Sequence, residues 1–250
     1  PTADVAQVRA WSHALTQTLE PYLTPEQVTA ALEASNHMDR YLTDAIAAKR
    51  RDPASDLLTE LVLAEEEGDR MSEAELLSMT SLLFVAGHET TVNLIGNGTH
   101  ALLGHPEQLE LVRTDESVDD TVADELLRYD SPVQTSGRRV MHDVEVADQI
   151  IPSGEMVLTA LGSANRDPRF WGSTADELDV TRGDANRHVS FGSGVHHCLG
   201  AALARMEGEI AITHLLRRFP DLALADEPTF NARIILRGRE VLPVRLGSAA

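Results

Sequence analysis

The sequence predicts a mainly α-helical fold with a small β portion. Helices are expected at residues 72–103, 119–129 and 201–216, and the first of these carries both a start and a stop signal. The segment 133–161 instead contains a tight-turn tetrapeptide between short β-type runs. Hydrophobic residues make up 42% of the 250 residues, which is enough to build a core.

The other elements follow from the same signals. Further helices are expected at residues 5–19, 25–49, 56–66 and 107–111. The tetrapeptide Ile151-Pro152-Ser153-Gly154 is expected to turn the chain between strands at 144–146 and 156–161, and a closing strand is expected at 241–246. The acidic run at 65–69 is expected to be a solvated loop between helices.

The longest predicted helix spans residues 72–103. Ser72 and Glu75 form a capping-box pattern at its start, and Gly104 and Pro106 stop it. At 1.5 Å per residue it would be about 45 Å long. Its polar residues interrupt the apolar pattern too often for a membrane span.

The middle of this helix reads Ala86-Gly87-His88-Glu89-Thr90-Thr91. Glycine costs about 1 kcal/mol in a helix interior relative to alanine, and threonine is a poor helix former. One interpretation is a close helix–helix crossing at Ala86-Gly87, with Glu89 simply solvated. The other is a ligand that approaches the backbone closely and needs the acid and the hydroxyls. The residues alone leave both open.

The only cysteine, Cys198, lies in the segment Phe191–Gly200 and directly precedes the helix at 201–216. Glycines at 192, 194 and 200 let the backbone fold tightly and approach a large flat ligand. The free N–H groups of a helix N-terminus favour the thiolate, which is the metal-binding form of cysteine. An inert buried thiol is the alternative, because free cysteines usually are buried.

This segment resembles the haem-binding loop of the cytochrome P-450 family, whose pattern Phe-x-x-Gly-x-x-x-Cys-x-Gly is met by Phe191, Gly194, Cys198 and Gly200. The resemblance implies heme b (iron protoporphyrin IX) as cofactor, with Cys198 as the axial iron ligand. It also implies that His196 and Arg138, or its neighbour Arg139, bond haem propionates. The implied cofactor-binding residues are Arg138, Phe191, Gly192, His196, Cys198 and Gly200.

The segment Ala86–Thr91 resembles the oxygen-activation segment of the same family, Ala-Gly-x-Glu-Thr-Thr. The resemblance implies that Thr90 donates a hydrogen bond to bound dioxygen and that Glu89 relays protons from solvent. Small residues at 86 and 87 would leave space for dioxygen and substrate.

Glu125 and Arg128 are three residues apart, which places both side chains on one helix face. Taken alone, such a pair is usually exposed and contributes little. It resembles the family's Glu-x-x-Arg motif, which implies a buried structural triad with Arg182 that holds the cysteine loop.

The resemblance covers essentially the whole chain and implies a cytochrome P-450 fold and monooxygenase activity. One oxygen atom from O2 would be inserted into a small apolar substrate, with electrons from a ferredoxin or flavodoxin-like protein and its NAD(P)H reductase. Arg205 matches a partner-docking position; otherwise it would be an ordinary surface cation. The implied substrate pocket includes Leu82, Leu83, Ala86, Val133, Gln134 and Ile235.

The chain is shorter than the roughly 400 residues of soluble relatives, so we expect residues 1–250 to be a partial cytochrome P-450 domain lacking the N-terminal portion. A non-catalytic fragment, or a P-450-like structural or allosteric partner of another enzyme, is the alternative function. The net charge of −19 argues against nucleic acid or an anionic membrane as partner, and one cysteine excludes an internal disulfide framework. We expect a cytoplasmic protein of secondary metabolism.

Overall fold

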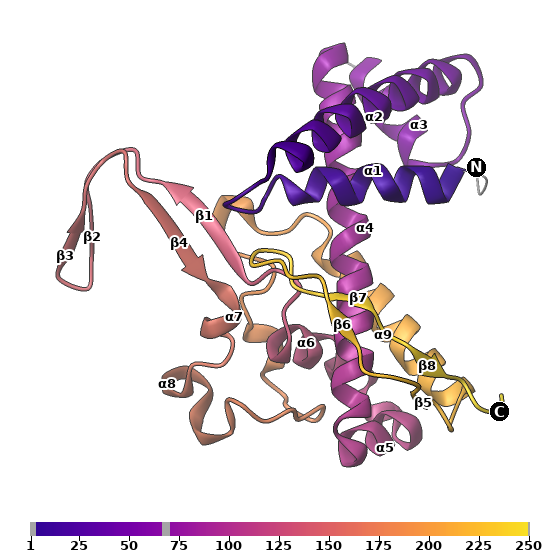
Figure 1. The fold of residues 1–250 in the computed structure, drawn as a ribbon, viewed down its shortest axis with the longest axis vertical. Helices are drawn as coiled ribbons and strands as arrows, with labels where there is room; N and C mark the ends of the chain where they lie inside the picture. Colours follow the sequence, from indigo (N-terminus) through magenta and orange to yellow (C-terminus); the bar gives the residue numbers. More distant parts are fainter. Residues whose placement is uncertain (1–3, 67–70, 250) are drawn as a thin grey trace. The chain divides into compact units, whose positions relative to one another are not determined.

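The computed structural model describes residues 4–66 and 71–249, which form two compact units (Figure 1). The first unit is Pro1–Glu89 and the second is Thr90–Ala250. The dividing point falls inside one continuous helix, α4 (Glu73–Leu103), so this helix contributes to both units.

Among the described residues of the first unit, every regular element is a helix. It contains α1 (Val5–Gln17), α2 (Pro25–Arg51), α3 (Leu57–Glu66) and the N-terminal half of α4. Thr24 begins α2 with a complete capping box, in which its hydroxyl accepts from the Gln27 amide and the Gln27 side chain accepts from the Thr24 amide. The buried core residues of this unit include Val8, Met38, Leu42, Ile46, Val62 and Leu76.

The second unit has a helical core built from α5 (Pro106–Thr114), α6 (Asp119–Tyr129), α9 (Ala201–Arg218) and the C-terminal half of α4. Two glycines allow the core helices to approach closely. A Cβ at Gly98 would lie 2.9 Å from Leu126 Cδ1, and one at Gly208 would lie 2.7 Å from Leu94 Cδ2. The buried core includes Leu94, Leu102, Val112, Val122, Leu126, Ile212 and Leu216.

The second unit also contains four two-stranded antiparallel sheets within its described part, residues 90–249. They pair β1 (Thr135–Arg139) with β4 (Met156–Ala160), β2 (Val144–Val146) with β3 (Gln149–Ile151), β5 (Ala223–Leu224) with β8 (Val244–Arg245), and β6 (Thr229–Phe230) with β7 (Arg239–Val241). Short helices α7 (Leu161–Ala164) and α8 (Pro168–Trp171) follow β4.

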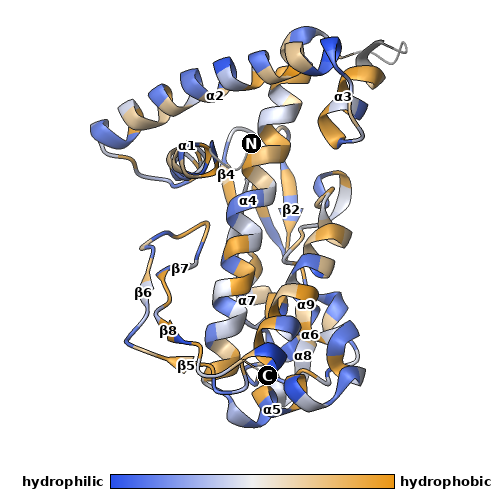
Figure 2. Ribbon diagram, turned by 90° about the vertical axis from the view of Figure 1, so that its right-hand side faces the viewer, coloured by the Kyte–Doolittle hydropathy of each residue, from blue (hydrophilic) through white to orange (hydrophobic). Residues whose placement is uncertain are grey.

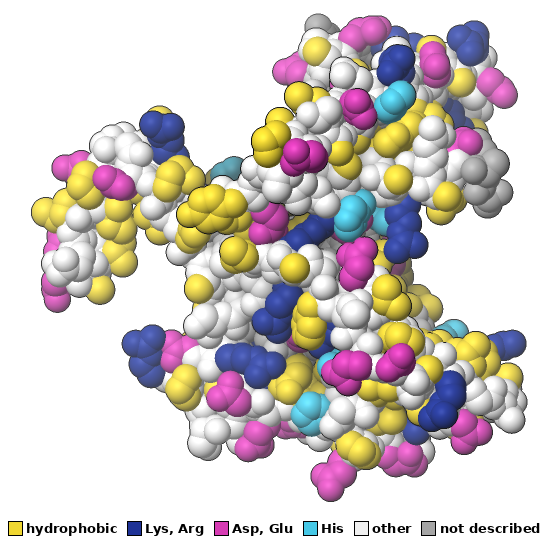
Figure 3. Space-filling model, in the orientation of Figure 1, with side chains coloured by type: hydrophobic (Ala, Val, Ile, Leu, Met, Phe, Trp, Pro, Cys, Tyr) yellow, Lys and Arg dark blue, Asp and Glu magenta, His cyan; other side chains and the backbone are white. Residues whose placement is uncertain are grey.

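The predicted strands at 144–146 and 156–161 are confirmed as β2 and β4, although the second ends at Ala160, and the chain turns between them at Ser153 and Gly154, where Gly154 has a φ of +94°. These two strands do not pair with each other. Instead β2 and β3 form a hairpin that turns at Ala147 and Asp148, both with positive φ, and its apolar side chains are largely exposed (Figure 3). A turn that places non-glycine residues at positive φ was not recognisable from Ala-Asp.

The mainly helical prediction is confirmed, and the observed bounds differ from it by a few residues. Helix α4 starts after Ser72, whose amide donates to Glu75 and whose hydroxyl accepts from the Glu75 amide. The helix at α5 is longer than predicted, and the closing strand is split into β7 and β8. In the acidic run at 65–69, α3 extends to Glu66, and residues 67–69 lie outside the described residues.

Hydrophobic and hydrophilic residues alternate along α4 (Figure 2). Within residues 4–66 and 71–249, no helix is both long and apolar enough to cross a membrane.

Candidate functional site

Cys198 is exposed at the end of a loop that leads into α9. Gly192 and Gly194 both adopt φ of +68°, a conformation that favours glycine and folds the loop back on itself. The Cys198 amide then donates to the Phe191 carbonyl over 2.9 Å. The alternative of a buried thiol is therefore wrong.

The residues beside the thiol fit a large apolar ligand. Val195 is 97% exposed and Leu199 is 84% exposed, so the loop presents apolar side chains on both sides of Cys198. No group of three or more His, Cys, Asp or Glu side chains suited to a metal occurs among the described residues. A metal bound by Cys198 would thus take its other ligands from the group that carries it, as an iron macrocycle provides.

Phe191 is held from several directions. The Arg205 guanidinium lies 4.6 Å from the centre of its ring, and the rings of His188 and His197 lie 5.3 and 6.3 Å away. Arg205 Nε also donates to Asp124 Oδ1 over 2.6 Å, and the Arg205 side chain is 35% exposed. Arg205 therefore contacts the cysteine loop, and its guanidinium side chain is also partly accessible to solvent.

The Asp124 carboxyl is buried on α6 and also meets His188 Nε2 at 3.0 Å. Burial acts to raise its pKa, but the hydrogen bonds from His188 and Arg205, together with the charge of Arg205, outweigh burial, so the pKa lies below its ordinary value of 3.8. Asp124 thus remains a carboxylate at neutral pH. Sequence analysis missed this residue because an acid one position before Glu125 looks like an ordinary surface charge.

Glu125, Arg128 and Arg182 are brought together by the structure. Glu125 accepts from Arg128 Nε at 2.7 Å and from Arg128 Nη2 at 2.8 Å, and Arg182 Nε lies 3.2 Å from Glu125 Oε2. The Glu125 and Arg128 side chains are 0% exposed, unlike those of an ordinary surface pair.

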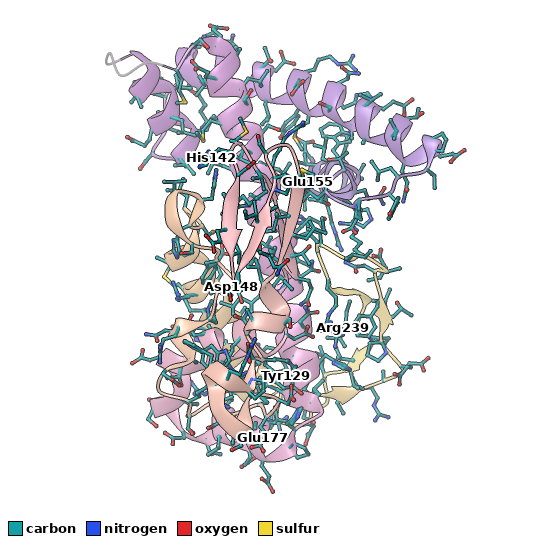
Figure 4. All side chains as sticks on the ribbon, turned by 90° about the vertical axis from the view of Figure 1, so that its left-hand side faces the viewer. Tyr129, His142, Asp148, Glu155, Glu177 and Arg239 are labelled. Atoms are coloured by element: carbon teal, nitrogen blue, oxygen red, sulfur yellow. The ribbon has the colours of Figure 1, made fainter. Side chains whose placement is uncertain are left out.

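The Arg128 guanidinium uses all of its donor capacity. Besides Glu125, it donates to the carbonyl oxygens of Asn165, Ala175 and Glu177, the last of which is labelled in Figure 4. A guanidinium has five N–H donors, and these bonds with the two to Glu125 account for every one. Arg128 therefore fixes the segment between Asn165 and Glu177 against α6.

Asn165 links this network to the cysteine loop, and its role was not predicted from the sequence. Its carbonyl accepts from Arg128, its side-chain oxygen accepts from the Val189 amide, and its side-chain nitrogen donates to Ser190. Ser190 in turn donates to the Leu127 carbonyl. An irregular segment without periodicity gives no sequence signal for such a position.

Glu89 and Thr90 are consecutive residues in the middle of α4. Within the first unit, Glu89 is buried and His13 Nδ1 and His88 Nδ1 lie 3.8 and 3.7 Å from its Oε1. A Cβ at Gly87 would meet no described atom within 4 Å. Among the described residues, close approaches to a helical glycine by side chains of another helix lie instead at Gly98 and Gly208.

The pocket residues predicted in the second unit come together. Val133 forms a β-bridge with Leu236, and the Gln134 amide donates to the Ile235 carbonyl over 2.9 Å. Leu82, Leu83 and Ala86 lie on α4 in the first unit, where Leu83 lines an apolar groove with residues of α2 and α3.

A polar cluster stabilises the segment that carries Ile235. Asp130 accepts from Arg237 at 2.5 Å and from Arg239 at 2.9 Å, and Arg239, labelled in Figure 4, also donates to Asn97 and His100 on α4. No local sequence pattern predicts this cluster, because its members are far apart in the chain.

Arg138 and His196 are both exposed. Arg138 lies on β1 opposite Val157, and its guanidinium donates to Ser136 and to the Gly137 carbonyl on its own strand. His196 ends a single 3₁₀ turn, Gly194–His196, two residues before the thiol. Gly200 caps the start of α9.

Comparison with known proteins identifies the class. A family model described as Cytochrome P450 matches residues 117–233. Cytochrome P450 107B1 of Saccharopolyspora erythraea is 47% identical over 245 residues, which cover 96% of this chain and 58% of that protein. The polyketide biosynthesis cytochrome P450 PksS of Bacillus subtilis is 43% identical over 250 residues, covering 98% of this chain and 60% of that protein.

The solved structures agree. The crystal structure of P450BioI in complex with an acyl carrier protein carrying hexadec-9Z-enoic acid matches with a TM-score of 0.92 at 39% identity, covering 98% of this chain and 63% of that one. The chain belongs to the cytochrome P450 family. It spans less than two thirds of the length of these relatives.

Proposed function

We propose that this chain is the haem-binding portion of one cytochrome P450 domain, in a monooxygenase that inserts one oxygen atom from O2 into a small apolar substrate. The exposed Cys198 carries the proposal, because it ends a glycine-bent loop at the start of α9 and is flanked by exposed apolar side chains. Cys198 would be the iron ligand, with Phe191, Gly192 and Gly200 shaping the loop. When bound, the haem would supply the oxygen chemistry.

Glu89 and Thr90 would take part in proton transfer to the bound oxygen. The Thr90 hydroxyl would hold a proton near the oxygen, and the buried Glu89 carboxyl would pass protons to it, with His13 and His88 close to that carboxyl. Arg138 and His196 are both exposed and would bond the haem propionates.

The substrate would be apolar, since the proposed lining residues Leu82, Leu83, Ala86, Val133 and Ile235 are apolar. Val133 forms a β-bridge with Leu236, and the Gln134 amide donates to the Ile235 carbonyl. Relatives named for polyketide biosynthesis, or solved with a fatty acyl group, support a substrate of that apolar character. Electrons would come from a ferredoxin or flavodoxin-like protein and its NAD(P)H reductase, with Arg205 at the docking surface because part of its side chain is exposed.

The test is the ferrous–CO spectrum of the chain after haem loading. Thiolate ligation would shift the Soret band to the red, and Cys198→Ala would abolish that shifted band, since the chain has no other cysteine. A shifted band that survives in Cys198→Ala would overturn the assignment. Absence of any haem spectrum in the unaltered chain would favour a non-catalytic structural partner instead.

A further inference from the structure

The cluster of Asp124, His188 and Arg205 reaches the cysteine loop, and of its members only Arg205 has a role in the function proposed above. His188 Nε2 and Arg205 Nε both approach the same oxygen, Asp124 Oδ1, at 3.0 and 2.6 Å. Asp124 and the His188 ring are almost fully buried. Charge-assisted hydrogen bonds of this kind are stronger than neutral ones and fix the direction of the groups that form them.

The contacts of His188 define its protonation state. A carboxylate can only accept, so Nε2 carries a proton and donates to Asp124. The backbone amide of Ser190 donates to Nδ1 over 3.0 Å, so Nδ1 carries no proton. His188 is therefore a neutral imidazole with both ring nitrogens bonded, and its ring cannot rotate without losing two hydrogen bonds.

Both partners of Asp124 contact the ring of Phe191. The Arg205 guanidinium lies 4.6 Å from the ring centre, and the His188 ring centre lies 5.3 Å from it. Phe191 then accepts a hydrogen bond from the Cys198 amide through its own carbonyl. A continuous series of contacts thus runs from Asp124 to the residue that carries the thiol.

We propose that Asp124, His188 and Arg205 are positioning residues that hold Phe191, and through it the loop that carries Cys198, in one conformation. They are distinct from the triad of Glu125, Arg128 and Arg182, which fixes the earlier segment between Asn165 and Arg182. The geometry of the loop carries this inference, and only its consequence for iron ligation rests on the proposed function.

The chain offers a matched control. Asp119 on α6 accepts two hydrogen bonds from Arg217 on α9, at 2.6 and 2.9 Å. This pair joins the same two helices as Asp124 and Arg205. With a helical rise of about 1.5 Å per residue, Arg217 lies about 18 Å from Arg205 along α9. Asp119→Asn therefore removes a charged contact between α6 and α9 without touching Phe191.

Amide hydrogen exchange followed by mass spectrometry tests the proposal on the chain without added haem. In Asp124→Asn and in Arg205→Lys, which keeps the charge but lacks the planar guanidinium, the amide of Cys198 should exchange about tenfold faster or more. This follows because one charged hydrogen bond that stabilises the closed loop is weakened. In Asp119→Asn the same amide should exchange within about twofold of the unaltered rate, since that pair does not contact the loop.

The proposal would be overturned if the Cys198 amide exchanged at the same rate in Asp124→Asn and in Asp119→Asn. It would also be overturned if Asp124→Asn accelerated exchange equally at all core amides. If Asp124→Asn does not fold, Arg205→Lys provides the same comparison, because Arg205 is partly exposed. After haem loading, Asp124→Asn should lose the red-shifted ferrous–CO band sooner on warming than Asp119→Asn. A chain that binds no haem would contradict the proposed function while leaving the exchange result valid.

Discussion

Asp124 and Glu125 are consecutive residues of α6, yet their carboxylates hold two different segments of the chain. Glu125 binds Arg128 and Arg182, whereas Asp124 binds His188 and Arg205. Neighbouring residues of an α-helix point about 100° apart, so one turn can anchor two segments at once. The two carboxylates thereby fix segments before and after Ala185 to the same helix.

Removing the Glu125 carboxylate should be strongly destabilising. Glu125→Ala leaves the buried Arg128 guanidinium without its charged partner, which costs about 3–5 kcal/mol of unfolding free energy. Urea unfolding would measure the loss, and we expect insoluble or haem-free protein in the extreme case. As a control, Glu73→Gln breaks the exposed pair with Arg50 and should cost at most about 1 kcal/mol. A soluble Glu125→Ala with unchanged stability would show that the triad is dispensable.

Two glycines of α4 should respond to alanine in opposite directions. A Cβ at Gly98 would lie 2.9 and 3.0 Å from buried Leu126 and Ile212, so Gly98→Ala should destabilise the protein by about 1 kcal/mol or more. A Cβ at Gly96 would meet no described atom within 4 Å, so Gly96→Ala should stabilise it by about 0.5–1 kcal/mol through helix propensity. Thermal unfolding of both variants is the measurement. Equal signs for the two changes would contradict the packing of these helices.

Stability should fall as His100 becomes protonated in the unfolded chain. Arg239 donates to His100 Nδ1 at 2.7 Å and cannot accept, so the folded state holds a neutral ring. Burial, followed by the charge of Arg239, lowers the His100 pKa below its ordinary 6.5. Above 6.5 the ring is neutral in both states and contributes no pH dependence. Below it the unfolded state binds more protons, so stability declines until the lower pKa of the folded state is reached.

His100→Asn provides the comparison because it lacks the titrating ring. Urea unfolding at a series of pH values on both sides of 6.5 should give a shallower decline for His100→Asn than for the unaltered chain. Parallel pH profiles would mean that the contact between His100 and Arg239 does not form in solution.

Thr90 and Thr91 should differ in their effect on oxygen use. In the haem-loaded protein supplied with ferredoxin and reductase, Thr90→Ala should keep its haem content but release more hydrogen peroxide per NAD(P)H consumed. Thr91 donates to Glu207 at 3.1 Å, so Thr91→Ala removes a neighbouring hydroxyl with a structural partner and should keep normal coupling. Glu89→Gln should slow turnover with little change in the resting spectrum. Unchanged coupling in Thr90→Ala would require another proton donor.

The sequence by itself determined the helices, the family and the position of the cysteine loop. Capping signals at Ser72, stop signals at Gly104 and the glycine spacing around Cys198 are local in the chain, so they can be recognised without a structure. The predicted bounds of α6 and the predicted start of α9 agree with the structure.

Only the tertiary structure decided which strands pair and which charges are buried. The β2–β3 hairpin depends on positive φ at Ala147 and Asp148, and this conformation could not be predicted from either residue type. Asp124 meets Arg205, and Asp130 meets Arg239, across long stretches of chain. Whether a charged side chain is solvated or buried against a partner depends on contacts between distant segments, and these arise only when the helices and loops pack together.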